Sequence, residues 1–154
     1  MTRRYAALVL TVALTASLSA TLYAPQAKAQ TEPVAIVRIE VSTFRNMTGA
    51  LSCRLFTRPA DFPDGEGMAT QRAAISATQA SCAFANLAPG TYAVAVVHDE
   101  NGNGRLDRNV LGIPTEGYGV SNNRTYALSS PRWEESKFTV AAQDTVLLRV
   151  SLRY

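Results

Sequence analysis

The chain has 154 residues, with 15 basic and 12 acidic side chains and a formal net charge of +3. Three of the basic residues and none of the acidic ones lie within residues 1–29, so the 125 residues that follow carry 12 charges of each sign. A segment that is neutral overall and has no basic patch gives no electrostatic basis for binding nucleic acid. Its length suffices for one domain with its own core.

Residues 1–29 have the features of a secretory signal peptide. Arginines at the start precede an apolar run at 6–24, and Ala27 and Ala29 supply the small residues of a cleavage site. The alternative is a membrane anchor, because a run of this length nearly spans a bilayer. Ala, Thr and Ser dominate the run, and Pro25 precedes the small residues. We therefore expect cleavage near Ala29, no membrane insertion afterwards, and a periplasmic or secreted domain over residues 30–154.

Apolar and polar residues alternate with a period of two in most of this domain, which is typical of strands. The run at 92–97 is apolar on both faces, so it belongs in the middle of a sheet. Residues 58–68 are expected to form a loop, followed by a short helical turn at 70–75, and residues 99–123 a second, longer loop. The pattern predicts an all-β chain, a single antiparallel β-sandwich of about seven strands. Strands are expected at 37–42, 51–55, 92–97, 138–140 and 146–154.

The two cysteines each lie in a strand-like run. Cys53 has the same parity as Leu51 and Leu55, and Cys82 has the same parity as Phe84, so both thiols should point inward. In an oxidising compartment we expect a Cys53–Cys82 disulfide. The alternative is two inert buried thiols, and the absence of a CxxC motif argues against a redox-active pair.

The sequence DENGNGRLD at 99–107 spaces oxygen ligands as a calcium loop does. Side chains fall at positions one, three, five and nine, with Gly104 at the sharp turn of position six. Position twelve is Val110 instead of a bidentate Glu, so a complete site would need Glu116 to fold back. The candidate ligands are Asp99, Asn101, Asn103, the carbonyl of Arg105, Asp107 and Glu116. The resulting affinity would be weak, with a dissociation constant of about 10⁻⁴ to 10⁻³ M.

A turn without metal is the alternative for this loop. Asn-Gly-Asn-Gly is also a strong turn signal, because both residues tolerate positive φ. The segment that follows places polar and aromatic side chains in a frame of glycines. Residues 99–123 could therefore form a ligand or partner surface that includes Tyr118 and Asn122, or Tyr118 could pack onto the sheet.

The stretch FANLAPGTYAVAVVHD resembles the turn and strand of transthyretin-like and carboxypeptidase-regulatory-like β-sandwiches. Together with DENGNGRLD, LGIPTEGYGVSN and SPRWEESKF, it makes residues 34–154 similar to an exported bacterial family called domain of unknown function 2141. This resemblance implies a sandwich fold and a location outside the cytoplasm. It implies no catalytic residues.

His98 is the only histidine, which argues against zinc sites built from several histidines and against mechanisms that need a pair. No serine lies in a GxSxG context. His98 has the parity of Val94 and Val96, so we expect it to end a core face and to bond a backbone carbonyl. The predicted function is a monomeric, exported, non-enzymatic binding or structural module, with an unknown protein or carbohydrate as partner. The alternative is a small hydrolase that uses His98 with Asp99 or Glu116.

Overall fold

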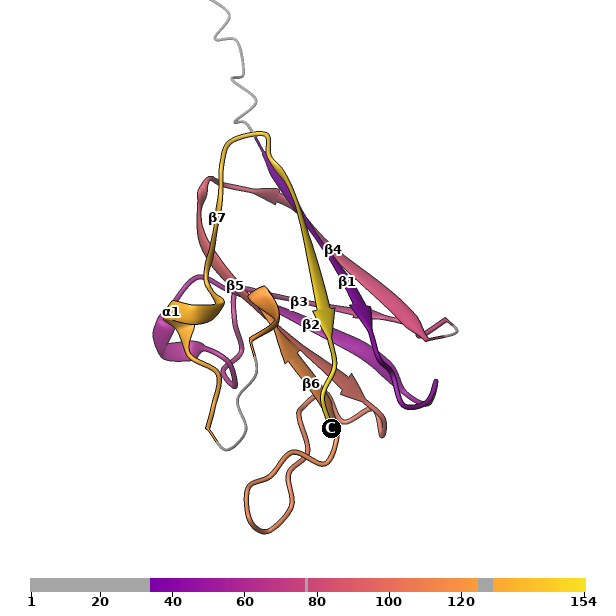
Figure 1. The fold of residues 1–154 in the computed structure, drawn as a ribbon. Helices are drawn as coiled ribbons and strands as arrows, with labels where there is room; N and C mark the ends of the chain where they lie inside the picture. Colours follow the sequence, from indigo (N-terminus) through magenta and orange to yellow (C-terminus); the bar gives the residue numbers. More distant parts are fainter. Residues whose placement is uncertain (1–33, 77, 125–128) are drawn as a thin grey trace, which may run out of the picture. The chain divides into compact units, whose positions relative to one another are not determined.

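The computed structural model describes residues 34–76, 78–124 and 129–154, and the expected signal peptide lies outside them. Over these residues the chain is mostly β, with two sheets (Figure 1). The described residues belong to one compact unit. Short helical segments occur at Pro59–Asp61, Ser121–Asn123 and Trp133–Ser136 (α1). None of the helices in the described parts of the chain is long and apolar enough to cross a bilayer.

The smaller sheet has the strand order β4-β1-β8. Its strands are β1 (Ala35–Ser42), β4 (Gln79–Leu87) and β8 (Thr145–Ser151). In β1, the alternation seen in the sequence becomes an alternation of buried and exposed side chains, with the buried ones facing the core. β1 pairs antiparallel with β4 but parallel with β8, so the expectation of purely antiparallel pairing is wrong for this pair. Residues 43–144 separate β1 from β8 in the chain, and parallel neighbours need such a long connection because a tight hairpin cannot join them.

The larger sheet has five strands, in the order β3-β2-β5-β6, with β7 also paired to β5. β5 is central, as its two apolar faces predicted. The strands are β2 (Ala50–Phe56), β3 (Ala69–Ala73), β5 (Gly90–Asp99), β6 (Gly117–Val120) and β7 (Phe138–Val140).

Two of these strands differ from the sequence prediction. The helical turn expected at 70–75 is wrong, because Ala69–Ala73 pairs with β2 as an edge strand. Its central residues are exposed, so no apolar alternation marks it, and ladder hydrogen bonds outweigh its helical propensity. The loop expected over 99–123 is interrupted by β6, whose glycines hide it. A Cβ on Gly119 would lie 2.5 Å from the side chain of Val150, so only glycine allows this close approach.

One apolar cluster contains buried residues from both sheets, including Ile39 of β1 and Val96 of β5. The predicted disulfide is confirmed: Cys53 of β2 is bonded to Cys82 of β4, with 6.5 Å between the Cα atoms, and it links the two sheets. Both cysteines are buried, as their parity predicted. The covalent link and the shared core therefore hold the outer face of each sheet in a fixed position.

Candidate functional site

A groove of about 630 Å³ lies on the face of the five-stranded sheet that points away from the shared core. Two rows of cross-strand partners form its floor. One row joins Arg54 of β2, Ala95 of β5 and Val120 of β6, and the other joins Ser52, Val97 and Tyr118. Directly opposed residues in a sheet share a face, so the register itself brings these side chains together.

An arm formed by residues 104–114 borders the groove. Its tip is held by Asn109, whose side-chain oxygen accepts hydrogen bonds from the backbone N–H groups of Leu111 and Ile113, at 2.9 and 3.0 Å. Gly112 adopts φ +77° at the tip, which favours glycine. The arm is therefore a hydrogen-bonded hairpin, and Thr115 closes it by donating its N–H to the carbonyl of Asp107.

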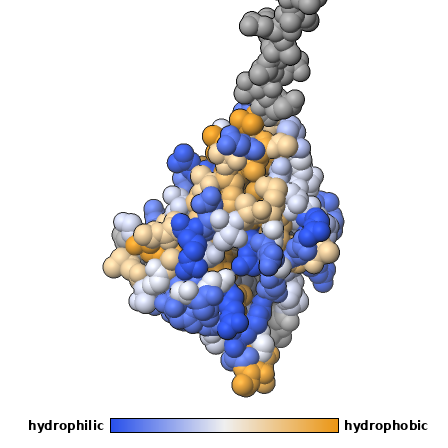
Figure 2. Space-filling model, turned by 180° about the vertical axis from the view of Figure 1, so that it is seen from behind, coloured by the Kyte–Doolittle hydropathy of each residue, from blue (hydrophilic) through white to orange (hydrophobic). Residues whose placement is uncertain are grey.

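The arm carries apolar side chains that are exposed to solvent. Leu111 is 78% exposed and Ile113 is 48% exposed, and both line the groove. Val110, which is fully exposed, is not among the lining residues. The hydrophobic tip is visible at the lower end of the molecule in Figure 2. Apolar side chains that line a groove and lie open to water are typical of binding sites.

Two buried carboxylates fix the base of the arm. Asp99 at the end of β5 accepts hydrogen bonds from the N–H groups of Gly102 and Gly104, at 2.8 and 2.9 Å, and forms an ion pair with Arg72 at 2.7 Å. Burial raises the pKa of Asp99, but the hydrogen bond from Gly104 and the Arg72 guanidinium outweigh it, so the net pKa lies below its ordinary value. Asp99 is therefore a charged anchor for the loop.

Glu116 does fold back toward the loop, where its carboxylate oxygens accept hydrogen bonds from the backbone. It accepts the N–H of Glu100 at 2.8 Å and that of Asp107 at 3.1 Å. The two ends of the arm are thus joined through one buried side chain. This contact explains how a long irregular segment keeps a defined position.

The calcium ligands predicted from the sequence lie close together but are bonded to one another. The side-chain N–H₂ groups of Asn101 and Asn103 both donate to the carboxylate of Asp107, at 2.6 and 2.8 Å. Their amide oxygens accept the N–H groups of Asn103 and Arg105. With Arg72 already neutralising Asp99, this arrangement does not fit a calcium ion, which needs six to eight oxygens directed at one point. Within the described residues, no group of three or more His, Cys, Asp or Glu side chains could together hold a metal ion.

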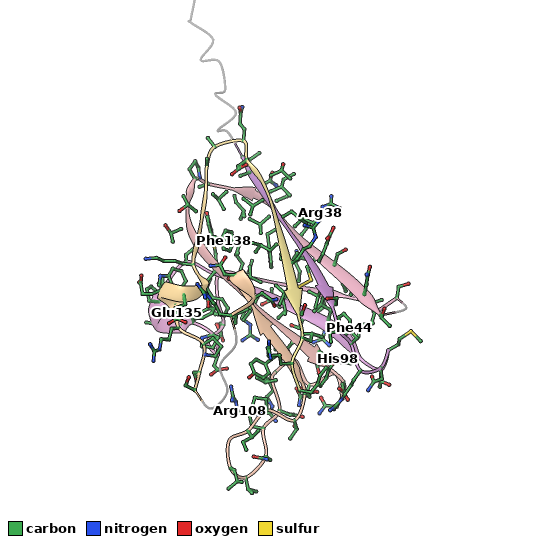
Figure 3. The ribbon with its side chains drawn as sticks, in the orientation of Figure 1. Arg38, Phe44, His98, Arg108, Glu135 and Phe138 are labelled. Atoms are coloured by element: carbon green, nitrogen blue, oxygen red, sulfur yellow. A yellow bond between two sulfur atoms is a disulfide. The ribbon has the colours of Figure 1, made fainter. Side chains whose placement is uncertain are left out.

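His98 is fully buried next to Phe44, with 5.1 Å between the ring centroids (Figure 3). Its Nε2 lies 2.8 Å from the carbonyl oxygen of Thr48, and its Nδ1 lies 2.7 Å from the hydroxyl of Tyr154. The expected bond to a backbone carbonyl is therefore present. Both ring nitrogens are engaged, and the acidic side chain near the ring is Glu100, at 3.5 Å, instead of the Asp99 or Glu116 that the hydrolase alternative requires.

The structure separates the two residues predicted to bind a ligand. Tyr118 lines the groove. Asn122 is not among the lining residues, and its side chain donates to the carbonyls of Glu135 and Lys137, at 3.1 and 3.0 Å, which holds α1 in place. Sequence reasoning missed Arg54, although its outward parity between Cys53 and Leu55 was available.

A protein-family model described as "Uncharacterized protein conserved in bacteria (DUF2141)" matches residues 39–147. This range includes all of the groove floor and the whole arm. No curated protein and no solved structure matches the chain.

Proposed function

Since the chain belongs to this bacterial family, DUF2141, we propose its function from its own geometry: it is an exported, non-enzymatic module that binds a ligand in the groove of the five-stranded sheet. The observation that carries the proposal is the groove itself. Its volume of about 630 Å³ is in the range of small-molecule sites, and its walls combine apolar side chains with a few polar groups.

The exposed faces of Leu111 and Ile113 support the same function. Holding these side chains in water costs free energy, and the hydrogen bonds of Asn109 fix them beside the groove instead of letting them collapse. A ligand with an apolar surface would cover them. The binding surface proposed here is thus part of residues 99–123 together with the outer face of β2 and β5.

Export is supported by the Cys53–Cys82 disulfide, because such bonds persist in oxidising compartments. The charge pattern and small-residue cleavage site of residues 1–29 agree with it. We further propose that the two sheets form a transthyretin-like β-sandwich. The core shared by residues of both sheets and the disulfide between β2 and β4 support this architecture.

We propose that the loop at 99–107 binds no ion and holds the base of the arm in a fixed position. The ion pair of Asp99 with Arg72 and the pairing of Asp107 with asparagine amides already satisfy its carboxylates. A non-enzymatic role is supported by His98, whose two ring nitrogens are both engaged in the interior.

The groove can be tested with an uncharged apolar fluorescent probe, Nile red, and two tryptophan variants. Val97→Trp fills the groove floor, whereas Arg38→Trp places the same side chain on an exposed position of β1 in the other sheet. We expect the wild type and Arg38→Trp to bind the probe alike, and Val97→Trp to bind it about tenfold more weakly or worse. Equal binding by Val97→Trp and the wild type would contradict the proposal.

A further inference from the structure

Arg54 is positioned differently from the other arginines of the described residues. Its side chain is half-buried on β2, and no carboxylate of those residues lies within ion-pair distance of it. The remaining arginines divide into two groups. Those with an ion pair are Arg45, Arg58, Arg72, Arg108, Arg132 and Arg149. Those exposed to solvent without one are Arg38, Arg105, Arg124 and Arg153.

Backbone carbonyls hold the Arg54 guanidinium in place. Nη1 donates to the carbonyl oxygens of Gly65 and Asp64, at 2.7 and 3.4 Å, and Nη2 donates to that of Gly104 at 3.4 Å. These bonds orient the group but leave its positive charge uncompensated. Within the described parts of the chain, no hydrogen bond occupies Nε. A fixed, partly desolvated cation is costly unless an anion approaches it.

The surroundings of Arg54 are apolar on the side of β5. Its cross-strand neighbour there is Ala95, whose partner on the other side is Val120, whereas its neighbour on β3 is Thr70. The arm adds Leu106 and Pro114 to the lining. A second cation of the lining, Arg108, is already paired with the carboxylate of Asp64 at 3.2 Å. The third cation of the lining, Arg105, is exposed to solvent, so Arg54 is the partly buried cation of the lining that has no counter-ion among the described residues.

We propose that Arg54 forms the anion subsite of the groove, and that the ligand is an amphipathic carboxylate: one negative head group on an apolar body. A guanidinium matches a carboxylate in geometry, and the positive charge of Arg54 complements the negative head group. This inference rests on the proposed function, because it requires the groove to be a binding site. The apolar body would lie against Ala95 and Val97 and cover the exposed faces of Leu111 and Ile113.

The test compares decanoate with decanol, which has the same chain length but no charge, by calorimetric titration of the purified protein. We expect decanoate to bind the wild type at least about tenfold more tightly than decanol, because a hydrogen-bonded charge contributes that much. Arg54→Met keeps an unbranched apolar stem but removes the guanidinium, and should lower decanoate affinity to that of decanol. The control Arg38→Met removes an exposed arginine on β1 of the other sheet, outside the groove, and should leave both affinities unchanged.

A second variant, Arg54→Lys, keeps the charge but not the planar fork, and should bind decanoate with intermediate affinity. It also tests the proposal if Arg54→Met does not fold. If decanoate and decanol bind with equal affinity, and Val97→Trp abolishes the binding of both, the anion subsite is refuted while the groove remains the binding site. If neither decanoate nor decanol binds, and the fluorescent probe does not bind either, both proposals are overturned.

Discussion

The buried His98 is expected to stabilise the fold, and its replacement by leucine tests this directly. His98→Leu has a similar size but cannot bond the Thr48 carbonyl or the Tyr154 hydroxyl, which lie 2.8 and 2.7 Å from the ring. Each lost hydrogen bond costs about 1 kcal/mol, and more where a buried partner is left unsatisfied. The Tyr154 hydroxyl still accepts the N–H of Arg45 at 3.0 Å, which limits the penalty. The expected loss is about 2–3 kcal/mol in the free energy of unfolding.

Urea unfolding followed by circular dichroism measures this loss, and for a domain of this size it corresponds to a fall in Tm of about 10 °C. Tyr154→Phe removes one of the two partners and should lose about half as much. Neither residue lines the groove, so probe binding to the folded His98→Leu protein should equal that of the wild type. An unchanged urea midpoint for His98→Leu, or an intact fold that no longer binds, would refute the structural role assigned to this histidine.

Three further predictions concern the disulfide and the loop at 99–107, at the base of the arm. Replacing Cys53 and Cys82 by alanine opens a link over 29 residues and should lower the unfolding free energy by about 3.5 kcal/mol in urea titrations; no loss would contradict the link between the sheets. The pKa of Asp99 is lower in the folded chain than its ordinary value of 3.8. The stability that ionised Asp99 contributes is therefore fully present above pH 3.8, and it is lost as the pH falls through the pKa of the folded chain. Arg72→Met should therefore reduce the drop in stability measured between about pH 5 and pH 3, and an unchanged drop would show that the ion pair contributes nothing. Calcium at about 2 mM should leave Tm unchanged, whereas a site with a dissociation constant near 10⁻⁴ M at residues 99–107 would add about 1.8 kcal/mol and visibly raise it.

Much of the fold could be predicted because burial leaves a period of two in the sequence. The alternation at Val37, Ile39 and Val41 gave β1, and the inward parity of Cys53 and Cys82 gave the disulfide. Edge and glycine-rich strands leave no such pattern. β3 and β6 were missed because pairing with a neighbour, and not burial of alternate side chains, determines them.

The groove could be predicted only in part. The apolar outward face of β5, with Ala95 and Val97, was visible in the sequence but was attributed to a position in the middle of the sheet. Arg54 meets the carbonyl of Gly104, which is 50 residues away in the chain, so spacing alone could not place them together. Likewise, oxygen-bearing side chains at alternate positions of residues 99–107 predict ligands for an ion. Only the three-dimensional arrangement shows that asparagine amides contact the carboxylate of Asp107 and that Arg72 contacts that of Asp99.

The most direct test of the proposed function is a map of ligand contacts by NMR. Titration of the isotope-labelled protein with decanoate should shift the backbone amide signals of Ala95, Val97 and Tyr118 on the groove floor, and those of Leu111 and Ile113 on the arm. Amides of β1 in the other sheet should remain in place. Shifts confined to the three-stranded sheet, or none at saturating decanoate, would contradict the assignment of the groove as the binding site.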